Sequence, residues 1–121
     1  MRNMANKILI LFCLIVLTFY SFSQNNCNQK FSSYSSAKKY VETSSFQFKD
    51  ETDCSESSWI REAKFYSCDS KFGYFKFKTD YKTYIHEKLP ISIWYQFKNA
   101  SSKGSFYNQF IKHKYRLVCD L

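Results

Sequence analysis

The two histidines, His86 and His113, are the side chains best suited to acid–base chemistry in this sequence. Histidine titrates close to neutral pH, so a basic chain with two imidazoles among lysines is a candidate for nuclease-like proton transfer. His86 falls at the end of a predicted strand, where we expect a half-exposed sheet residue. His113 lies inside a solvated run of lysine and arginine. We therefore predict that the protein is not an enzyme, and keep a small hydrolase using His86 and His113 as the alternative.

Basic residues alternate with aromatic residues over the second half of the chain, and the whole sequence carries a net charge of +8. Lysine and arginine bind phosphates and aromatic rings stack nucleobases, so this pattern is typical of a platform for single-stranded nucleic acid. The same charge suits anionic membranes and cell-surface polymers, and the aromatic residues suit another polypeptide. A solvated face on an aromatic-cored domain is the simplest alternative. The candidate binding residues are Tyr74, Lys76, Lys78, Lys82, Tyr84, His86, Lys112, Lys114 and Arg116.

Four cysteines follow the N-terminal apolar segment, at Cys27, Cys54, Cys68 and Cys119. An even number in a small exported chain indicates disulfide bonds, and four cysteines allow three pairings. We favour Cys54–Cys68, which flank a predicted strand, together with Cys27–Cys119, which lie towards the two ends. No metal site is expected because the sequence lacks a Cys-x-x-Cys pair. No cofactor is expected either, since its two glycines lie too far apart for a phosphate-binding loop.

Three short strands are predicted in the middle of the chain, over 59–66, 74–78 and 83–86. The middle strand alternates strictly, with Phe75 and Phe77 on one face and Lys76 and Lys78 on the other. This pattern is typical of an antiparallel strand with one packed face and one wet, cationic face.

Two helices are predicted after the strands. Pro90 stands where a helix begins, because the first helical turn does not need its missing N–H. The helix carries an apolar stripe of Ile93, Trp94, Phe97 and Ala100. Gly104 is expected to end it in the left-handed conformation. A shorter stripe follows at Phe106, Tyr107, Phe110 and Ile111.

A further helix is predicted before the strands, starting at Ser35–Ser36 and covering one side of the domain. Residues 46–48 suit a short strand and residues 49–53 a charged loop. Because strands precede helices, we expect an α+β fold: a small three-stranded antiparallel sheet packed by two C-terminal helices, with an extra N-terminal helix.

The N-terminus has the three-part layout of a secretory signal peptide, which we assign to residues 1–23. Its apolar stretch, 8–22, is shorter than the ~20 residues of a spanning helix, although a retained anchor is the alternative. Removing the leader takes away Arg2 and Lys7 and lowers the net charge from +8 to +6. We expect a secreted or periplasmic protein with an N-terminal extension over 24–56 and a domain over 57–117.

An ordered set of residues within this domain resembles the KTSC domain family. The set comprises Ser58, Ile60, Phe65 or Tyr66, Tyr84, Leu89, Pro90, Ala100, Ser102, Gly104, Phe106, Tyr107, Asn108, Ile111, Lys112 and Tyr115. The resemblance implies a domain found at the C-terminus of some lysyl-tRNA synthetases and as a stand-alone bacterial protein. The family has no established activity, and its synthetase context has led to the suggestion of RNA binding. One departure is that the family's Tyr-x-Tyr reads Tyr84-Ile85-His86 here, which puts in doubt any role of the second tyrosine.

Taken together, these features predict an exported, non-enzymatic binding module. Its expected partner is an anionic molecule, either nucleic acid or an envelope polymer, or else a protein.

Overall fold

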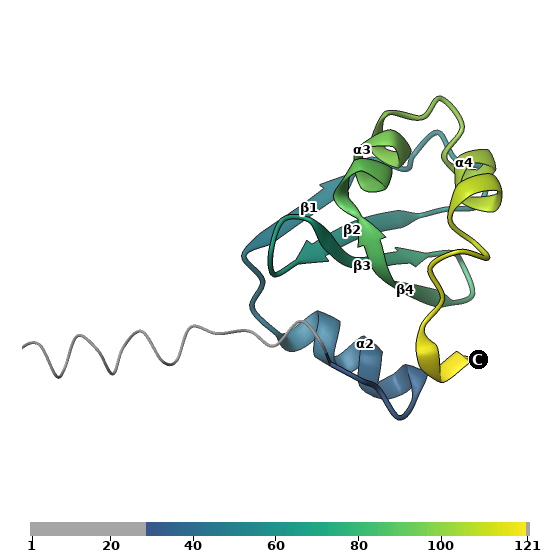
Figure 1. Ribbon diagram of the computed structural model, residues 1–121. Helices are drawn as coiled ribbons and strands as arrows, with labels where there is room; N and C mark the ends of the chain where they lie inside the picture. The colour runs from purple at the N-terminus through teal and green to yellow at the C-terminus, as the bar shows by residue number, and fades with distance from the viewer. Residues whose placement is uncertain (1–28, 121) are drawn as a thin grey trace, which may run out of the picture.

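A computed structural model describes residues 29–120. Its centre is an antiparallel sheet of four strands in the order β1-β2-β3-β4, so that each strand pairs with the next along the chain (Figure 1). The strands are β1 (Phe48–Thr52), β2 (Glu62–Ser67), β3 (Phe72–Lys78) and β4 (Thr83–Pro90). The helices are α2 (Tyr34–Thr43), α3 (Ile91–Asn99), α4 (Lys103–Phe110) and the 3-10 helix η1 (Val118–Asp120). The α+β class is therefore confirmed, with four strands in place of the expected three.

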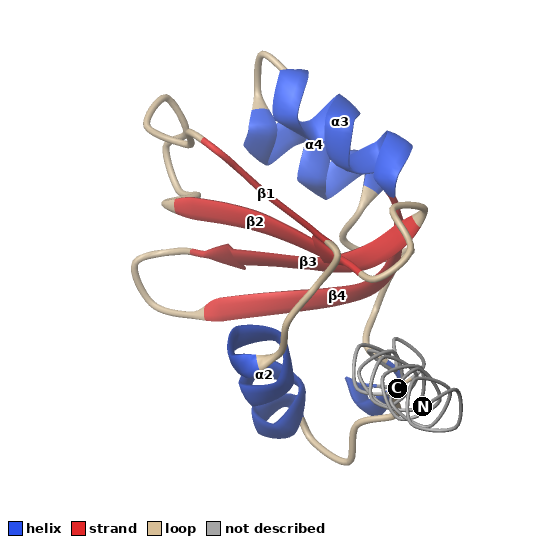
Figure 2. Ribbon diagram, turned by 90° about the vertical axis from the view of Figure 1, so that its left-hand side faces the viewer, coloured by secondary structure: helices blue, strands red, loops and turns tan. Residues whose placement is uncertain are grey.

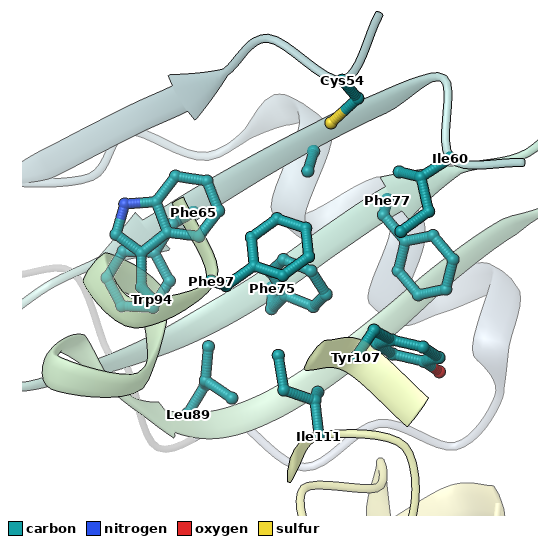
Figure 3. Close-up of a cluster of buried hydrophobic side chains, with 11 residues drawn as sticks. Cys54, Ile60, Phe65, Phe75, Phe77, Leu89, Trp94, Phe97, Tyr107 and Ile111 are labelled. Atoms are coloured by element: carbon teal, nitrogen blue, oxygen red, sulfur yellow. The ribbon is translucent and has the colours of Figure 1, made fainter. Parts of the chain in front are cut away.

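Helices α3 and α4 cover one face of the sheet, as the two predicted apolar stripes require. Phe65, Phe75 and Phe77 point to this face from β2 and β3 and are fully buried. Trp94 of α3 stacks on Phe65 with ring centroids 5.5 Å apart, and Phe97 meets Phe75 edge-on at 4.9 Å (Figure 3). Aromatic rings thus supply most of the volume of this core, and their close contacts fix α3 on the sheet.

Helix α2 covers the opposite face, so the sheet is sandwiched between helices (Figure 2). Ala37 and Val41 of α2 pack against Tyr66, Tyr74 and Ile85 of the sheet in a second buried cluster. Ser33 caps the helix, because its hydroxyl accepts a hydrogen bond from the backbone N–H of Ser36. The helix predicted from Ser35–Ser36 is confirmed, but the expectation of a wet second face is wrong.

The additional strand, β1, contains most of the segment that we expected to be a charged loop. It pairs along its length with β2, from Phe48 opposite Ser67 to Thr52 opposite Ala63. Strands at the edge of a sheet commonly carry charged residues, which discourage pairing with other chains.

Asp50 links this edge strand to α3. Its carboxylate accepts a hydrogen bond from the buried indole N–H of Trp94 at 2.9 Å and one from Lys98 Nζ at 2.9 Å. Burial alone would raise the pKa of Asp50, but the bonds from Trp94 and Lys98 outweigh it and lower the pKa below its usual value.

Gly104 does not end a helix, as the sequence led us to expect; it lies inside the first turn of α4. Ser102 precedes it as the N-cap, and the backbone around Gly104 is not left-handed. Position 104 requires a residue without a side chain for another reason. A Cβ atom there would lie 2.3 Å from Nε1 of Trp59. Gly104 therefore allows the indole of Trp59 to pack directly on the helix.

The predicted Cys54–Cys68 disulfide is wrong. Cys54 is a free thiol buried in the first core cluster, and burial raises its pKa. The predicted Cys27–Cys119 bridge involves Cys27, which lies outside the described residues. Within residues 29–120, no helix has both the length and the apolar character needed to cross a bilayer.

Candidate functional site

Tyr74 and Lys76, two of the predicted binding residues, lie beneath α2. The ring of Tyr74 is enclosed by Phe31, Tyr40 and Phe46 at centroid distances of 5.8–6.0 Å. Lys76 is only 5% exposed. Both residues were expected on a wet face, and α2 covers that face, so neither contributes to a binding surface.

The lysines of β3 are paired with acidic side chains. Lys76 Nζ lies 3.5 Å from Oε1 of Glu42 on α2, and Lys78 Nζ lies 3.7 Å from Oε2 of Glu62 on β2. Burial would raise the pKa of Glu42, but Lys38 and Lys76 together hold it below its usual value. The charges of β3 are therefore compensated within the protein.

His86 joins β4 to α4 and to the chain that follows it. Its Nε2 lies 2.8 Å from the hydroxyl of Tyr107, and its Nδ1 lies 3.0 Å from the carbonyl oxygen of Tyr115. A carbonyl only accepts, so Nδ1 carries the proton and, in the neutral ring, Nε2 accepts from Tyr107. The backbone N–H of Glu87 also donates to the Tyr115 carbonyl, at 3.2 Å. These bonds hold the C-terminal segment against the outer edge of β4.

His86 is thus buried, at 6% exposure, and the expectation of a half-exposed residue is wrong. Both ring nitrogens have a hydrogen-bond partner inside the protein, which leaves neither directed at a substrate. Burial also raises the pKa of Tyr107 well above its usual value. His113 is exposed on the segment after α4. These hydrogen bonds suit His86 to hold the segment after α4 in place better than to transfer a proton.

The remaining predicted cations lie on or beside this tethered segment. Residues 111–117 run from α4 past β4 to η1 along one side of the molecule (Figure 1). Lys112, Lys114 and Arg116 are exposed there, and Lys82 is exposed immediately before β4. None of the four takes part in an ion pair with another described residue. We call these four residues the tail surface.

Tyr84 adjoins the tail surface, but its ring is already occupied. It stacks on Phe77 with centroids 4.8 Å apart and an interplanar angle of 11°. The ammonium group of Lys82 lies over the same ring, 5.0 Å from its centroid. Tyr84 is therefore poorly placed to stack a nucleobase, which was the role expected of it.

The sequence did not lead us to a polar pocket of about 470 Å³ at the start of α4. It lies between the loop after β1 and the loop before α4, and six serines line it: Ser55, Ser57, Ser58, Ser101, Ser102 and Ser105. Several of their hydroxyls already bind the backbone, as Ser57 does with the N–H of Ile60. The serine content of the two loops is the only sequence signal that could have indicated it. No cluster of potential metal ligands occurs there or elsewhere in the described part of the chain.

Comparison of the sequence with known protein families identifies one match. Residues 56–115 match the sequence model of the KTSC domain. The chain carries a KTSC domain. The resemblance found in the sequence is thereby confirmed, whereas no curated protein and no solved structure matches the chain.

The KTSC match comprises β2, β3, β4, α3 and α4, together with Lys82, Lys112 and Lys114 of the tail surface. Helix α2 and strand β1 precede it. The first core cluster is thus built almost wholly by the KTSC domain, and α2 adds the cover that buries Lys76.

Proposed function

We propose that this KTSC domain protein is a non-catalytic binding module that holds an anionic partner on its tail surface. The supporting observation is the density of cations that lack an ion-pair partner in the described part of the chain, because three of them lie within residues 112–116. Lys76 and Lys78 of β3 have carboxylate partners, whereas Lys82, Lys112, Lys114 and Arg116 are exposed without one among the described residues. Exposed, uncompensated cations attract anions over distances near the Debye length.

The proposal of a non-catalytic role is supported by the surroundings of His86. A general acid or base must reach the proton that it transfers, and His86 is enclosed by Tyr107 and the backbone of Tyr115. His113 would then have to act alone on the exposed segment.

The proposal also includes export of the protein from the cytoplasm. The layout of residues 1–23 favours a cleaved leader, which would place the mature chain outside the cytoplasm. Residues 29–31 line one groove together with Cys119 and with Asp69, which follows Cys68 in the sequence. We expect Cys27 to pair with Cys68. N-terminal sequencing and disulfide mapping of the protein from its host test both points; a retained leader or fully reduced cysteines would count against export.

The test of anion binding compares two triple variants of equal charge. One variant is Lys112→Ser, Lys114→Ser, Arg116→Ser. The control is Lys39→Ser, Lys49→Ser, Lys71→Ser, which removes three exposed cations that also lack ion pairs but lie on α2, on β1 and before β3. The probe is immobilised dextran sulfate.

We expect the tail variant to elute at much lower salt than the control, although both have the same net charge. Equal elution of the two variants would mean that net charge alone, and not this surface, governs binding, and the proposal would fail.

A further inference from the structure

Exposed apolar side chains stand at both ends of the basic segment. Phe110, the last residue of α4, is 37% exposed, and Val118, the first residue of η1, is 61% exposed. Lys112, Lys114 and Arg116 lie between them along the chain, and the ammonium group of Lys114 is 5.8 Å from the ring centroid of Phe110. The segment that connects them forms the outer side of the molecule beside β4 (Figure 1). Cations and apolar groups are therefore presented together.

The exposed apolar surface near Val118 includes a second side chain. Phe72, which is 53% exposed, lines the same groove of about 580 Å³ as Val118. The lysines of that groove, Lys30 and Lys88, have no ion-pair partner among the described residues.

The two acidic side chains of the groove are directed at the backbone. Asp69 Oδ1 accepts hydrogen bonds from the N–H groups of Lys71 and Phe72 at 2.9 and 3.0 Å. Glu87 Oε1 accepts one from the N–H of Val118 at 3.0 Å. Both carboxylates are held by backbone N–H groups, and Lys30 and Lys88 are exposed beside the apolar side chains of the groove.

We propose that the partner of the tail surface is a membrane containing acidic lipids, an inference that rests on the function proposed above. Lys112, Lys114 and Arg116 meet the lipid phosphates, while Phe110 and Val118 enter the boundary between headgroups and acyl chains. Cations with adjoining apolar residues are what interfacial binding requires, because electrostatic attraction and burial of apolar area add together. A soluble polyanion would use the charges and leave Phe110 and Val118 in water.

Single-stranded nucleic acid fits the same surface less well. Sequence-tolerant binding of single strands relies on ring faces that stack bases beside the phosphate-binding cations. Tyr74 is buried, and Tyr84 already lies between Phe77 and Lys82. Neither predicted ring offers that face, and Val118, the most exposed apolar side chain of the segment, has no ring on which a base could stack.

The test is sedimentation of the mature protein with vesicles of about one-third phosphatidylglycerol in phosphatidylcholine, with pure phosphatidylcholine vesicles as the reference. The tail variant Lys112→Ser, Lys114→Ser, Arg116→Ser is compared with the Lys39, Lys49 and Lys71 control. Each cation near an anionic surface strengthens partition by roughly fivefold, so we expect the tail variant to bind roughly 100-fold more weakly. The control should lose far less.

Apolar insertion is tested by Val118→Ser, which changes a mostly exposed side chain, and by Phe110→Ser with a check that its melting temperature is retained. Tyr95→Ser on α3 serves as control, since Tyr95 is 43% exposed and lies away from the segment. We expect each of the first two variants to bind acidic vesicles a few-fold more weakly, while their elution from dextran sulfate stays unchanged.

Three results would overturn the inference: equal binding to acidic and neutral vesicles, no effect of Val118→Ser on vesicle binding, or displacement from vesicles by an equal charge concentration of oligothymidylate. If dextran sulfate binding still depends on the tail cations, the proposed function stands and only the membrane is refuted. If that dependence is also lost, both fail together.

Discussion

Replacing His86 by Phe should destabilise the protein through two hydrogen bonds that no Phe can make. The ring of Phe has a similar size and can remain between Tyr107 and the segment after α4, so cavity formation is a minor contribution. The hydroxyl of Tyr107 loses its acceptor in a buried position, and the carbonyl of Tyr115 loses one of two donors. That carbonyl retains its bond from the N–H of Glu87 at 3.2 Å.

The expected loss follows from these partners. An orphaned buried hydroxyl costs about 1–3 kcal/mol, and one intramolecular hydrogen bond contributes about 1 kcal/mol. The sum is about 2–4 kcal/mol, which for a domain of this size corresponds to a melting temperature lower by roughly 10–25 °C. Urea unfolding followed by tryptophan fluorescence measures the free energy directly.

A double-mutant cycle with Tyr107→Phe identifies the His86–Tyr107 bond itself. The double variant removes both partners of this bond, so neither partner remains buried without a hydrogen bond. We expect it to be more stable than the sum of the single losses predicts, by about 1–2 kcal/mol. If the losses in unfolding free energy of the two single variants simply add, or if His86→Phe costs less than about 0.5 kcal/mol, His86 does not hold the segment after α4 in place.

Further variants and conditions test three other sites. Asp50→Ala should cost about 1–3 kcal/mol in urea unfolding because the buried indole N–H of Trp94 loses its acceptor, and Asp50→Asn should cost less because an amide oxygen still accepts. Since the pKa of Asp50 is lowered in the folded state, its contribution is complete above its unfolded pKa of about 3.9 and is lost as the pH falls through the folded pKa; a wild-type stability that is flat below pH 4 would contradict this. Gly104→Ala should destabilise the protein by about 1–3 kcal/mol and shift the fluorescence of Trp59, whose Nε1 lies 2.3 Å from the added Cβ position. The Cys54 thiol should resist thiol reagents until urea unfolds the core, and fast labelling of Cys54 in the native protein would show that the site is open.

The first core cluster was predictable because its sequence patterns have one plausible interpretation. Phe75 and Phe77 alternate with lysines, and Trp94 and Phe97 recur at helical spacing; both sets pack as expected. Pro90 likewise stands directly before α3. In each case, side-chain periodicity alone decides which face is buried.

The second face of the sheet was not predictable in the same way. Lys76 marks that face as polar, yet a lysine can bury its alkyl chain when its ammonium group finds a carboxylate, here that of Glu42 on α2. The partner is 34 residues away in sequence, so no local pattern indicates the pairing. Consequently, Tyr74 and Lys76 are core residues on this face. Because His86 is buried as well, the candidate surface is reduced to the cations beside β4.

Strand β1 and Gly104 were misassigned for related reasons. The sequence of β1 is mostly charged, which is typical of a loop and equally of an edge strand, and only its pairing with β2 distinguishes them. Gly104 has the residue type of a helix end, but the constraint comes from Trp59, which is distant in sequence. Tertiary contacts, which local propensity does not encode, decided both.

The salt dependence of dextran sulfate binding tests the central claim most directly. The logarithm of affinity falls linearly with the logarithm of salt concentration, with a slope proportional to the number of anionic sites neutralised. The tail variant lacks Lys112, Lys114 and Arg116, so its slope should be smaller than that of the wild type by roughly 2–3, while the Lys39, Lys49 and Lys71 control keeps the wild-type slope. Identical slopes for the wild type and the tail variant would contradict the assignment of the anionic partner to the tail surface.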